Sequence, residues 1–126
     1  MEYRFRGWDA VGYKGWVYGD LVHNKRVDLT DRVMVGGYEV VPESVGMWTG
    51  LNDEVGCPIY EGDIVRCNEF LYQVAYDDRR IASFFLRRGG DMYRHYFGEA
   101  MEADECEVID TMFENKELLE LKECYD

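Results

Sequence analysis

Two carboxylates flank a glycine in the run Tyr60-Glu61-Gly62-Asp63, and this is the arrangement in the chain closest to an acid–base pair. General acid–base catalysis would require one of the two to lie in a cleft with a raised pKa. A structural explanation fits the pattern better, because glycine permits a turn that its neighbours could not form. Asp63 can then accept a backbone N–H bond and begin a strand at Ile64-Val65. We therefore interpret these four residues as structural.

Histidines and cysteines give no catalytic or metal-binding motif either. His95 stands between Arg94 and Tyr96 without a Ser, Cys or carboxylate partner, which predicts a surface or rim histidine and not a general base. The four cysteines, at positions 57, 67, 106 and 124, include no CxxC pair and lie far from both histidines in the sequence. We expect reduced, buried cysteines, no bound metal, no cofactor and no enzymatic activity.

Composition and charge limit the class of protein. A chain of 126 residues suits one domain and leaves no room for a multidomain enzyme. Its net charge of −12 disfavours general binding to nucleic acid or to an anionic membrane, although −9 of it lies in residues 99–126. No apolar run approaches the roughly 18 residues of a membrane span, and residues 1–8 do not resemble an export signal. We expect a cytoplasmic protein that does not bind membranes.

The elements that position these residues are predicted to be strands. Aromatic residues make up 15% of the chain and occur in short runs broken by glycine and acidic turns, which is typical of β structure. Gly36-Gly37 predicts a tight hairpin turn between 33–35 and 38–41, and Asn68-Glu69 predicts another between 64–67 and 71–76. Further strands are expected at 3–7, 16–18, 47–49, 58–60, 81–86, 92–97 and 106–113.

Two segments depart from this strand pattern. Residues 21–32 are polar and mixed in charge, which predicts mostly loop with a short extended piece at 27–29. Asn115 is a suitable N-cap for a short terminal helix that must dock on the core to persist. Together the elements predict a mainly β fold: a small antiparallel SH3-like barrel or meander with an N-terminal β-hairpin region and a short C-terminal helix.

Three stretches in chain order resemble the YopX family of phage and prophage proteins. The first pairs Phe5-Arg6-Gly7-Trp8-Asp9 with 16–21, the second and most specific runs through 41–65, and the third joins 107–109 to 113–119. Asp110 and Lys116 depart from the family pattern. The residues of the second stretch that we interpret as structural are Thr49, Gly50, Leu51, Tyr60, Glu61, Gly62 and Asp63.

The resemblance implies a mostly β protein that is encoded on mobile elements and acts in the cytoplasm of a bacterial host. It implies no particular activity. It also implies one family domain over residues 1–126, with an N-terminal β-hairpin region at 1–58. Residues 59–126 would then form a barrel-like region with the C-terminal helix.

A basic segment is the main candidate for an interaction surface. Between Asp77 and His95 five arginines accompany three aspartates. The pairs at 79–80 and 87–88 would lie at opposite ends of one strand, roughly 20 Å apart at ~3.3 Å per residue, so a single phosphate pocket is not expected. A solvated hairpin whose charges protect a sheet edge is the simpler interpretation. Trp48 is either a core anchor or part of a binding surface. The candidate surface comprises Arg79, Arg80, Arg87, Arg88, Arg94, His95, Tyr96 and Trp48.

Three functions stay open. The first is a non-enzymatic phage accessory protein that binds a phage or host protein, or that forms a homo-oligomer in which residues 79–95 meet the acidic tail of another copy. The second is nucleic-acid binding, with the arginines on phosphates and Tyr93, Tyr96 or Phe97 stacked on bases, which the net charge disfavours. The third is an acidic C-terminal region that imitates nucleic acid and occupies a basic host protein.

Overall fold

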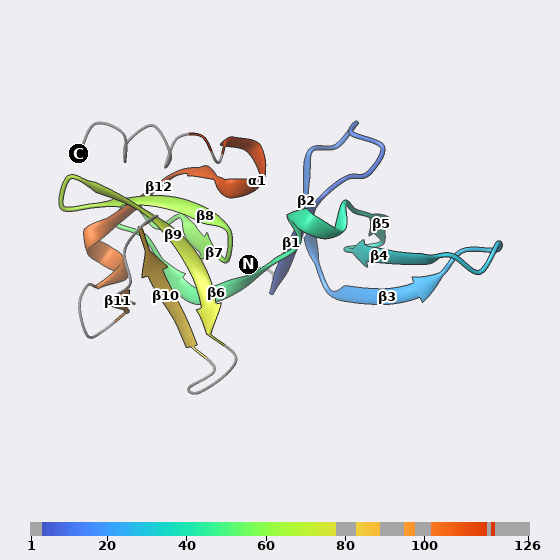
Figure 1. The fold of residues 1–126 in the computed structure, drawn as a ribbon, viewed down its shortest axis with the longest axis horizontal. Helices are drawn as coiled ribbons and strands as arrows, with labels where there is room; N and C mark the ends of the chain where they lie inside the picture. Colours follow the sequence, from blue (N-terminus) through green and yellow to red (C-terminus); the bar gives the residue numbers. More distant parts are fainter. Residues whose placement is uncertain (1–3, 78–82, 89–94, 98–101, 116, 118–126) are drawn as a thin grey trace. The chain divides into compact units, whose positions relative to one another are not determined.

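The computed structural model describes residues 4–77, 83–88, 95–97, 102–115 and 117 (Figure 1). The chain divides into two compact units, Met1–Trp48 and Thr49–Asp126. Each unit is described here by itself. The expectation of one family domain over 1–126, with regions 1–58 and 59–126, stays a prediction.

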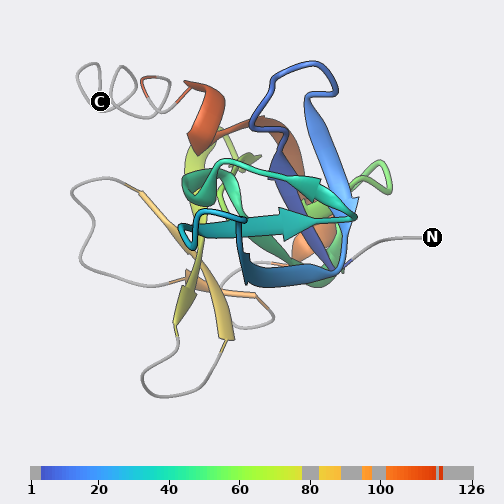
Figure 2. The same cartoon turned by 90° about the vertical axis from the view of Figure 1, so that its right-hand side faces the viewer.

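Antiparallel strands build the first unit. β1 (Phe5–Trp8) pairs with β2 (Trp16–Gly19) on one side and with the start of β6 (Gly46–Asn52) on the other. A second sheet has the order β3-β4-β5. It is formed by β3 (Leu21–Lys25), β4 (Asp31–Val35) and β5 (Tyr38–Glu39), and the 3₁₀ turn η1 (Pro42–Ser44) follows. Both views in Figures 1 and 2 show β3 and β4 as neighbouring strands.

The prediction of mostly loop over 21–32 is wrong. Five residues, Leu21–Lys25, form strand β3, and residues 27–29 lie in the turn that joins it to β4. Four of the five β3 residues are exposed, so both faces of this strand carry solvent-facing side chains. The strand therefore lacks the alternation of apolar and polar residues that marks a half-buried strand. Its order comes from the hydrogen-bonded ladder with β4 and not from a buried face.

A small aliphatic cluster stabilises the first unit. Val17, Val35 and Val40 are buried, and Phe5, Leu21, Val33 and Val45 pack against them. These residues come from the hairpin β1–β2, from the three-stranded sheet and from the segment after it. Burial of valine side chains contributes about 1.5–3 kcal/mol each, which makes this cluster the main apolar contribution within the unit.

The second unit is the predicted antiparallel meander. The later residues of β6 pair with β7 (Pro58–Tyr60), and a five-stranded sheet has the order β11-β10-β9-β8-β12. Its strands are β8 (Asp63–Cys67), β9 (Phe70–Asp77), β10 (Ser83–Arg87), β11 (His95–Tyr96) and β12 (Cys106–Thr111). Asn68 and Glu69 have φ values of 51° and 77°, as the predicted two-residue hairpin turn requires.

Two of the four cysteines are joined, so the expectation of reduced cysteines is wrong for this pair. Cys67 and Cys106 are fully buried and form a disulfide between register partners on β8 and β12, with 4.5 Å between their Cα atoms. That separation is typical of a directly opposed pair in an antiparallel ladder and suits a disulfide. Cys57 is not disulfide-bonded and is exposed, contrary to the expected burial, and Cys124 lies outside the described residues.

The terminal helix begins earlier than the sequence predicts. α1 (Met112–Asn115) follows β12 directly, so Asn115 lies inside it and is not its N-cap. The cap is Thr111, whose Oγ1 accepts the backbone N–H of Glu114 at 3.1 Å and bonds to the Glu114 carboxylate at 3.2 Å. In the second bond the Thr111 hydroxyl donates to the carboxylate, while the N–H of Thr111 itself donates to Asp110 Oδ1 at 2.8 Å. This side-chain cap stabilises the first turn.

The architecture is mainly antiparallel β with one short C-terminal helix, as predicted. Within the described residues the sheets form a barrel-like meander and not a closed barrel. None of the helices in the described ranges is both long enough and apolar enough to span a membrane.

Candidate interaction surfaces

Asp63 and Gly62 of the Glu61-Gly62-Asp63 run make bonds that hold the fold. Asp63 is fully buried, and its Oδ2 accepts the backbone N–H of Tyr60 at 2.7 Å. Gly62 has a φ of 92°, a conformation that favours glycine, and its N–H donates to the carbonyl of Val74 at 2.9 Å. Its own carbonyl accepts the N–H of Met112 at 2.7 Å. Through Gly62 and Asp63 the run therefore joins β7, β8, β9 and α1.

The Thr49-Gly50-Leu51 part of the family motif also makes structural bonds. The Thr49 hydroxyl donates to the carbonyl of Ile59 at 2.8 Å and accepts the N–H of Leu51 at 3.2 Å. Trp48, the last residue of the first unit, is half-buried, and its N–H donates to the carbonyl of Arg4 at 2.6 Å. The backbone of Trp48 thus belongs to the strand ladder.

Only part of the predicted basic surface falls within the described residues. Arg79, Arg80 and Arg94 lie outside them, and of His95 only the backbone, in β11, is described. Arg87 is exposed, whereas the guanidinium of Arg88 lies 4.3 Å from the ring centre of Phe70 and is half-buried. Tyr96 packs its ring at 5.7 Å from that of Phe85. The two described arginines therefore differ in environment, and whether the whole segment binds a partner stays a prediction.

Asp53 is a structural residue whose role the sequence reveals only in part. The Asp53–Gly56 spacing predicts a turn, and the N–H of Gly56 does donate to the carbonyl of Asp53 at 3.0 Å. Its buried carboxylate also accepts the N–H groups of Val55 and Cys57 through Oδ1, at 3.0 and 2.8 Å. Oδ2 accepts the N–H of Val108 at 2.9 Å, 55 residues away in sequence, and no sequence pattern marks this contact.

The turn between β3 and β4 is held by a dense set of hydrogen bonds. We call residues 26–30 the hairpin tip. Within it the N–H of Arg26 donates to the carbonyl of Thr30 at 2.8 Å, and the N–H of Leu29 donates to the carbonyl of Arg26 at 2.9 Å. The Asp28 carboxylate accepts both the N–H and the hydroxyl of Thr30, at 3.0 and 2.6 Å. These bonds leave the tip little conformational freedom.

Charged side chains at and beside the hairpin tip are paired with charged side chains of β4 and β5. Lys25 forms an ion pair with Asp31 at 2.8 Å, and Arg26 forms one with Glu39 on β5. Arg26 also donates to the hydroxyl of Thr30 at 3.1 Å and to the carbonyl of Asp31 at 2.8 Å. The basic residues of this hairpin are thus engaged within it.

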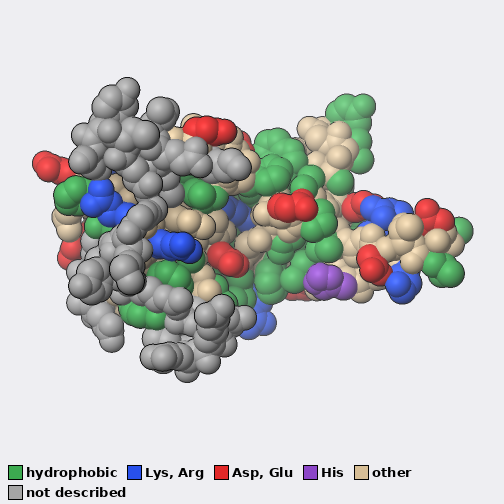
Figure 3. Space-filling model, in the orientation of Figure 1, with side chains coloured by type: hydrophobic (Ala, Val, Ile, Leu, Met, Phe, Trp, Pro, Cys, Tyr) green, Lys and Arg blue, Asp and Glu red, His purple; other side chains and the backbone are tan. Residues whose placement is uncertain are grey.

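The hairpin tip presents apolar side chains to solvent. Val27 has a relative exposure of 104% and Leu29 one of 75%. Leu29 has a φ of 70°, in the left-handed region, and this position of a three-residue hairpin loop normally takes glycine. In Figure 3 hydrophobic side chains lie at the far end of this hairpin, with acidic and basic ones along its sides.

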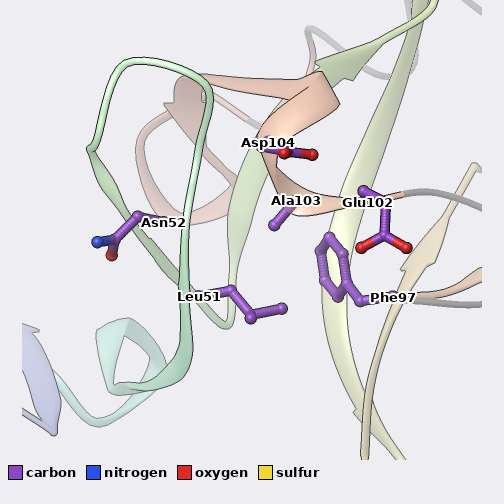
Figure 4. A pocket seen from close by; sticks show the side chains of 6 residues that line it. All are labelled: Leu51, Asn52, Phe97, Glu102, Ala103 and Asp104. Carbon is purple, nitrogen blue, oxygen red and sulfur yellow. The ribbon is translucent and has the colours of Figure 1, made fainter.

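A pocket of about 330 Å³ opens on the second unit. In Figure 4 the side chain of Leu51 points toward Phe97, and the Glu102 carboxylate lies beside the Phe97 ring. The amide of Asn52 points away from it. Six residues line the pocket: Leu51, Asn52, Phe97, Glu102, Ala103 and Asp104. Its walls are thus apolar, with carboxylates at the rim.

These features define a small antiparallel β protein whose described surface offers an apolar hairpin tip and, on the second unit, a pocket with a carboxylate rim. A family model, described as YopX protein, matches residues 4–120, and the chain belongs to the YopX family.

Comparison with solved structures agrees with this fold. The chain is similar to the crystal structure of protein EF1440 from Enterococcus faecalis, with a TM-score of 0.52 and 22% sequence identity. The match covers 92% of this chain and 96% of that one. A comparison with curated proteins found no match.

Proposed function

We propose that this YopX-family protein is a non-enzymatic protein-interaction module of phage or prophage origin, and that it binds its partner through the β3–β4 hairpin tip. The observation that carries the proposal is the exposure of Val27 and Leu29 on a turn held by hydrogen bonds. The partner is a protein with an apolar pocket, either a phage or host protein or a second copy of this chain.

Exposed apolar side chains alone are common on protein surfaces. The hairpin tip differs because its backbone is already ordered, so a partner would not have to supply the ordering free energy. Leucine in the left-handed region also costs about 1–2 kcal/mol relative to an ordinary conformation. A side chain kept at an unfavourable backbone position and left in solvent is a reasonable candidate for a contact made with another molecule.

Charge at the hairpin favours a protein partner over nucleic acid. Phosphate contacts need accessible Lys or Arg side chains. Lys25, which precedes the tip, and Arg26, its first residue, are already paired with Asp31 and Glu39. An apolar tip flanked by internally neutralised charges suits the pocket of a protein, where the apolar side chains leave water.

A photo-crosslinking amino acid placed at position 27 would test the proposal. The matched control is the same substitution at Val55, which is 76% exposed on the turn after β6. In a lysate of the cells from which the gene comes, we expect a discrete protein adduct from position 27 and none from position 55. An adduct of twice the chain's mass would identify a second copy as the partner.

Two further arms separate the alternatives. Leu29→Asn tolerates a positive φ and removes the apolar side chain, so we expect it to reduce the position-27 adduct at least fivefold while the fold is retained. Nuclease treatment should leave the adduct intact. Equal adducts at 27 and 55, or an adduct that nuclease removes, would contradict the proposal, the latter in favour of nucleic-acid binding.

A further inference from the structure

We propose that the pocket lined by Leu51, Phe97, Ala103, Glu102 and Asp104 binds the side chain of an arginine in a basic segment of a partner protein. The site lies in the second unit and uses none of the residues of the hairpin tip. It is therefore a second contact surface, which extends the proposed interaction function and can fail or succeed without it.

The apolar part of the pocket suits the methylene groups of a long basic side chain. Phe97 is half-buried and packs against the main core of the unit, and Ala103 belongs to that core with an exposure of 8%. Leu51 faces the ring of Phe97 from β6 (Figure 4). Arginine buries its aliphatic stem on such surfaces while its charged end stays near water. An aromatic ring beside the site also attracts a guanidinium group.

The carboxylates of Glu102 and Asp104 lie at the rim of the pocket, where the guanidinium of a bound arginine would be located. Glu102 and Asp104 lie at the start of the 3₁₀ turn η2 (Ala103–Glu105), which the bond from the N–H of Glu105 to the carbonyl of Glu102, at 3.0 Å, holds in place. Both side chains are exposed, and neither forms an ion pair with another residue of the described ranges. Two carboxylates at the rim of an apolar pocket favour a cation, and the planar guanidinium binds carboxylates more specifically than an ammonium does.

Size and charge both favour one basic side chain of a protein. A volume of about 330 Å³ lies at the lower end of the range for ligand pockets, which suits a single side chain better than a cofactor. Residues 49–126 carry 8 Lys and Arg against 19 Asp and Glu, so the field of this unit attracts basic segments. The same field repels the phosphates of nucleic acid.

NMR titration of the oxidised full-length chain with the peptide acetyl-Gly-Arg-Gly-Arg-Gly-amide tests the site. We expect saturable amide shifts concentrated at positions 51, 97 and 102–104, with binding that weakens as salt rises. The same peptide with citrulline in place of arginine keeps the shape and loses the charge. It should produce at least fivefold weaker binding.

Two double variants distinguish binding in the pocket from general electrostatic attraction of the peptide to this acidic unit. Glu102→Gln with Asp104→Asn removes both rim charges, and Glu54→Gln with Glu105→Gln removes two nearby exposed charges that do not line the pocket. We expect at least a fivefold loss of affinity from the first pair and less than a twofold loss from the second. Amide spectra of both double variants show directly whether the fold is kept.

Three outcomes would overturn the proposal: equal losses from the two double variants, equal binding of the citrulline peptide, or no localised shifts at 5 mM arginine peptide. The arginine peptide does not probe the hairpin tip. The crosslinking experiment at position 27 does not probe the pocket. Failure of either proposal is thus distinguishable from failure of the other.

Discussion

The carboxylate of Asp53 accepts three backbone N–H groups and ties the turn after β6 to β12. Asp53→Ala removes the acceptor of three partly buried hydrogen bonds at once, which we expect to lower the free energy of unfolding by about 3 kcal/mol. Asp53→Asn keeps one carbonyl oxygen and should cost less. Urea denaturation measures both.

Glu54 supplies the control for Asp53. Its side chain is exposed, and its backbone N–H, which donates to Cys106 at 2.9 Å, is unchanged by substitution. Glu54→Ala should therefore stay within about 0.5 kcal/mol of the parent protein. If Asp53→Ala were equally mild, the three hydrogen bonds would not hold the turn as described.

Gly36 illustrates a close approach that only glycine allows. A Cβ atom at this position would lie 2.4 Å from the carbonyl oxygen of Tyr18, and the φ of Gly36 is 60°. The adjacent Gly37 also has a positive φ, of 88°, but a Cβ there would meet nothing within 4 Å. Gly37→Ala should cost about 1 kcal/mol, from the backbone conformation alone.

The steric clash should make Gly36→Ala clearly worse than Gly37→Ala. We expect a difference of at least about 2 kcal/mol, because backbone atoms and not a flexible side chain must move. Thermal and urea unfolding of the two variants, compared side by side, give the measurement. Equal stability of the pair would show that the approach of residue 36 to Tyr18 is not maintained.

Asp28 in the hairpin tip should titrate below its ordinary range. The hydroxyl of Thr30 is the main cause of the lowered pKa, and the N–H of Thr30 and the charge of Arg26 act in the same direction. A carboxyl whose pKa is lower in the folded state stabilises that state above its unfolded pKa. This contribution is lost as the pH falls through the folded pKa.

Carboxyl NMR titration of Thr30→Val tests this explanation. Because the variant lacks the hydroxyl donor, we expect the pKa of Asp28 to rise toward its ordinary value. An unchanged Asp28 titration would show that the hydroxyl is not what holds the carboxylate in the tip.

At the level of elements, the sequence predicts a strand correctly where the alternation of apolar and polar side chains reflects which face is buried. The meander β8–β9–β10 was predictable because alternating apolar residues and the Asn68-Glu69 turn agree. Strand β3 was not, because its side chains are exposed on both faces. The N-cap of α1 is Thr111, which is also the last residue of β12. Local helix propensity instead predicts the N-cap four residues later, at Asn115.

The candidate surfaces were harder to predict than the strands. Leu51 was placed in the family motif, but the pocket also needs Phe97 and Ala103, which only the register of the folded chain brings near it. The hairpin tip was expected to be an extended piece at 27–29, so the exposure of Val27 and Leu29 could not be anticipated. Surfaces made from several elements leave no periodic signal in one segment.

The disulfide between β8 and β12 should contribute strongly to the stability of the second unit. It closes a loop between residues 39 apart, and such a crosslink lowers the entropy of the unfolded chain by the equivalent of about 4 kcal/mol. We expect reduction, or Cys67→Ala with Cys106→Ala, to lower the free energy of unfolding by about this amount. Urea denaturation with and without reductant compares the stability of the reduced and the disulfide-bonded protein.

Cys57 provides the matched control for the disulfide, because it is exposed and not disulfide-bonded. Cys57→Ser should change neither the stability nor its dependence on reductant. Alkylation of the unfolded, unreduced protein followed by mass spectrometry should leave Cys67 and Cys106 unmodified. Labelling at both positions, or stability indifferent to reductant, would contradict the crosslink.

At the scale of the whole molecule, the two units differ in charge and in core. Residues 1–48 hold 6 Lys and Arg against 7 Asp and Glu, so nearly all of the net charge of −12 belongs to residues 49–126. The first unit therefore suits contacts that depend on apolar side chains, and the second suits contacts that depend on charge. This division is the reason that the hairpin tip and the pocket are assigned different partner chemistry.

Each unit also has buried clusters of its own. One cluster in the first unit is centred on Val17, Val35 and Val40, and the main cluster of the second contains Ile59, Val65 and Leu86. Proteins often open in cooperative units that follow such cores. We therefore expect a cavity in one core to raise the amide exchange of its own strands selectively.

Native-state hydrogen exchange of Val40→Ala and Ile59→Ala tests this expectation. Each variant removes buried methyl groups and should destabilise its unit by about 2 kcal/mol or more. Val40→Ala should accelerate exchange at least tenfold in β1–β5 and leave β8–β12 near the parent rates, and Ile59→Ala should do the reverse. Equal acceleration over both sets of strands by either variant would show that the chain opens as one cooperative unit, and the division at Trp48 would then have no energetic meaning.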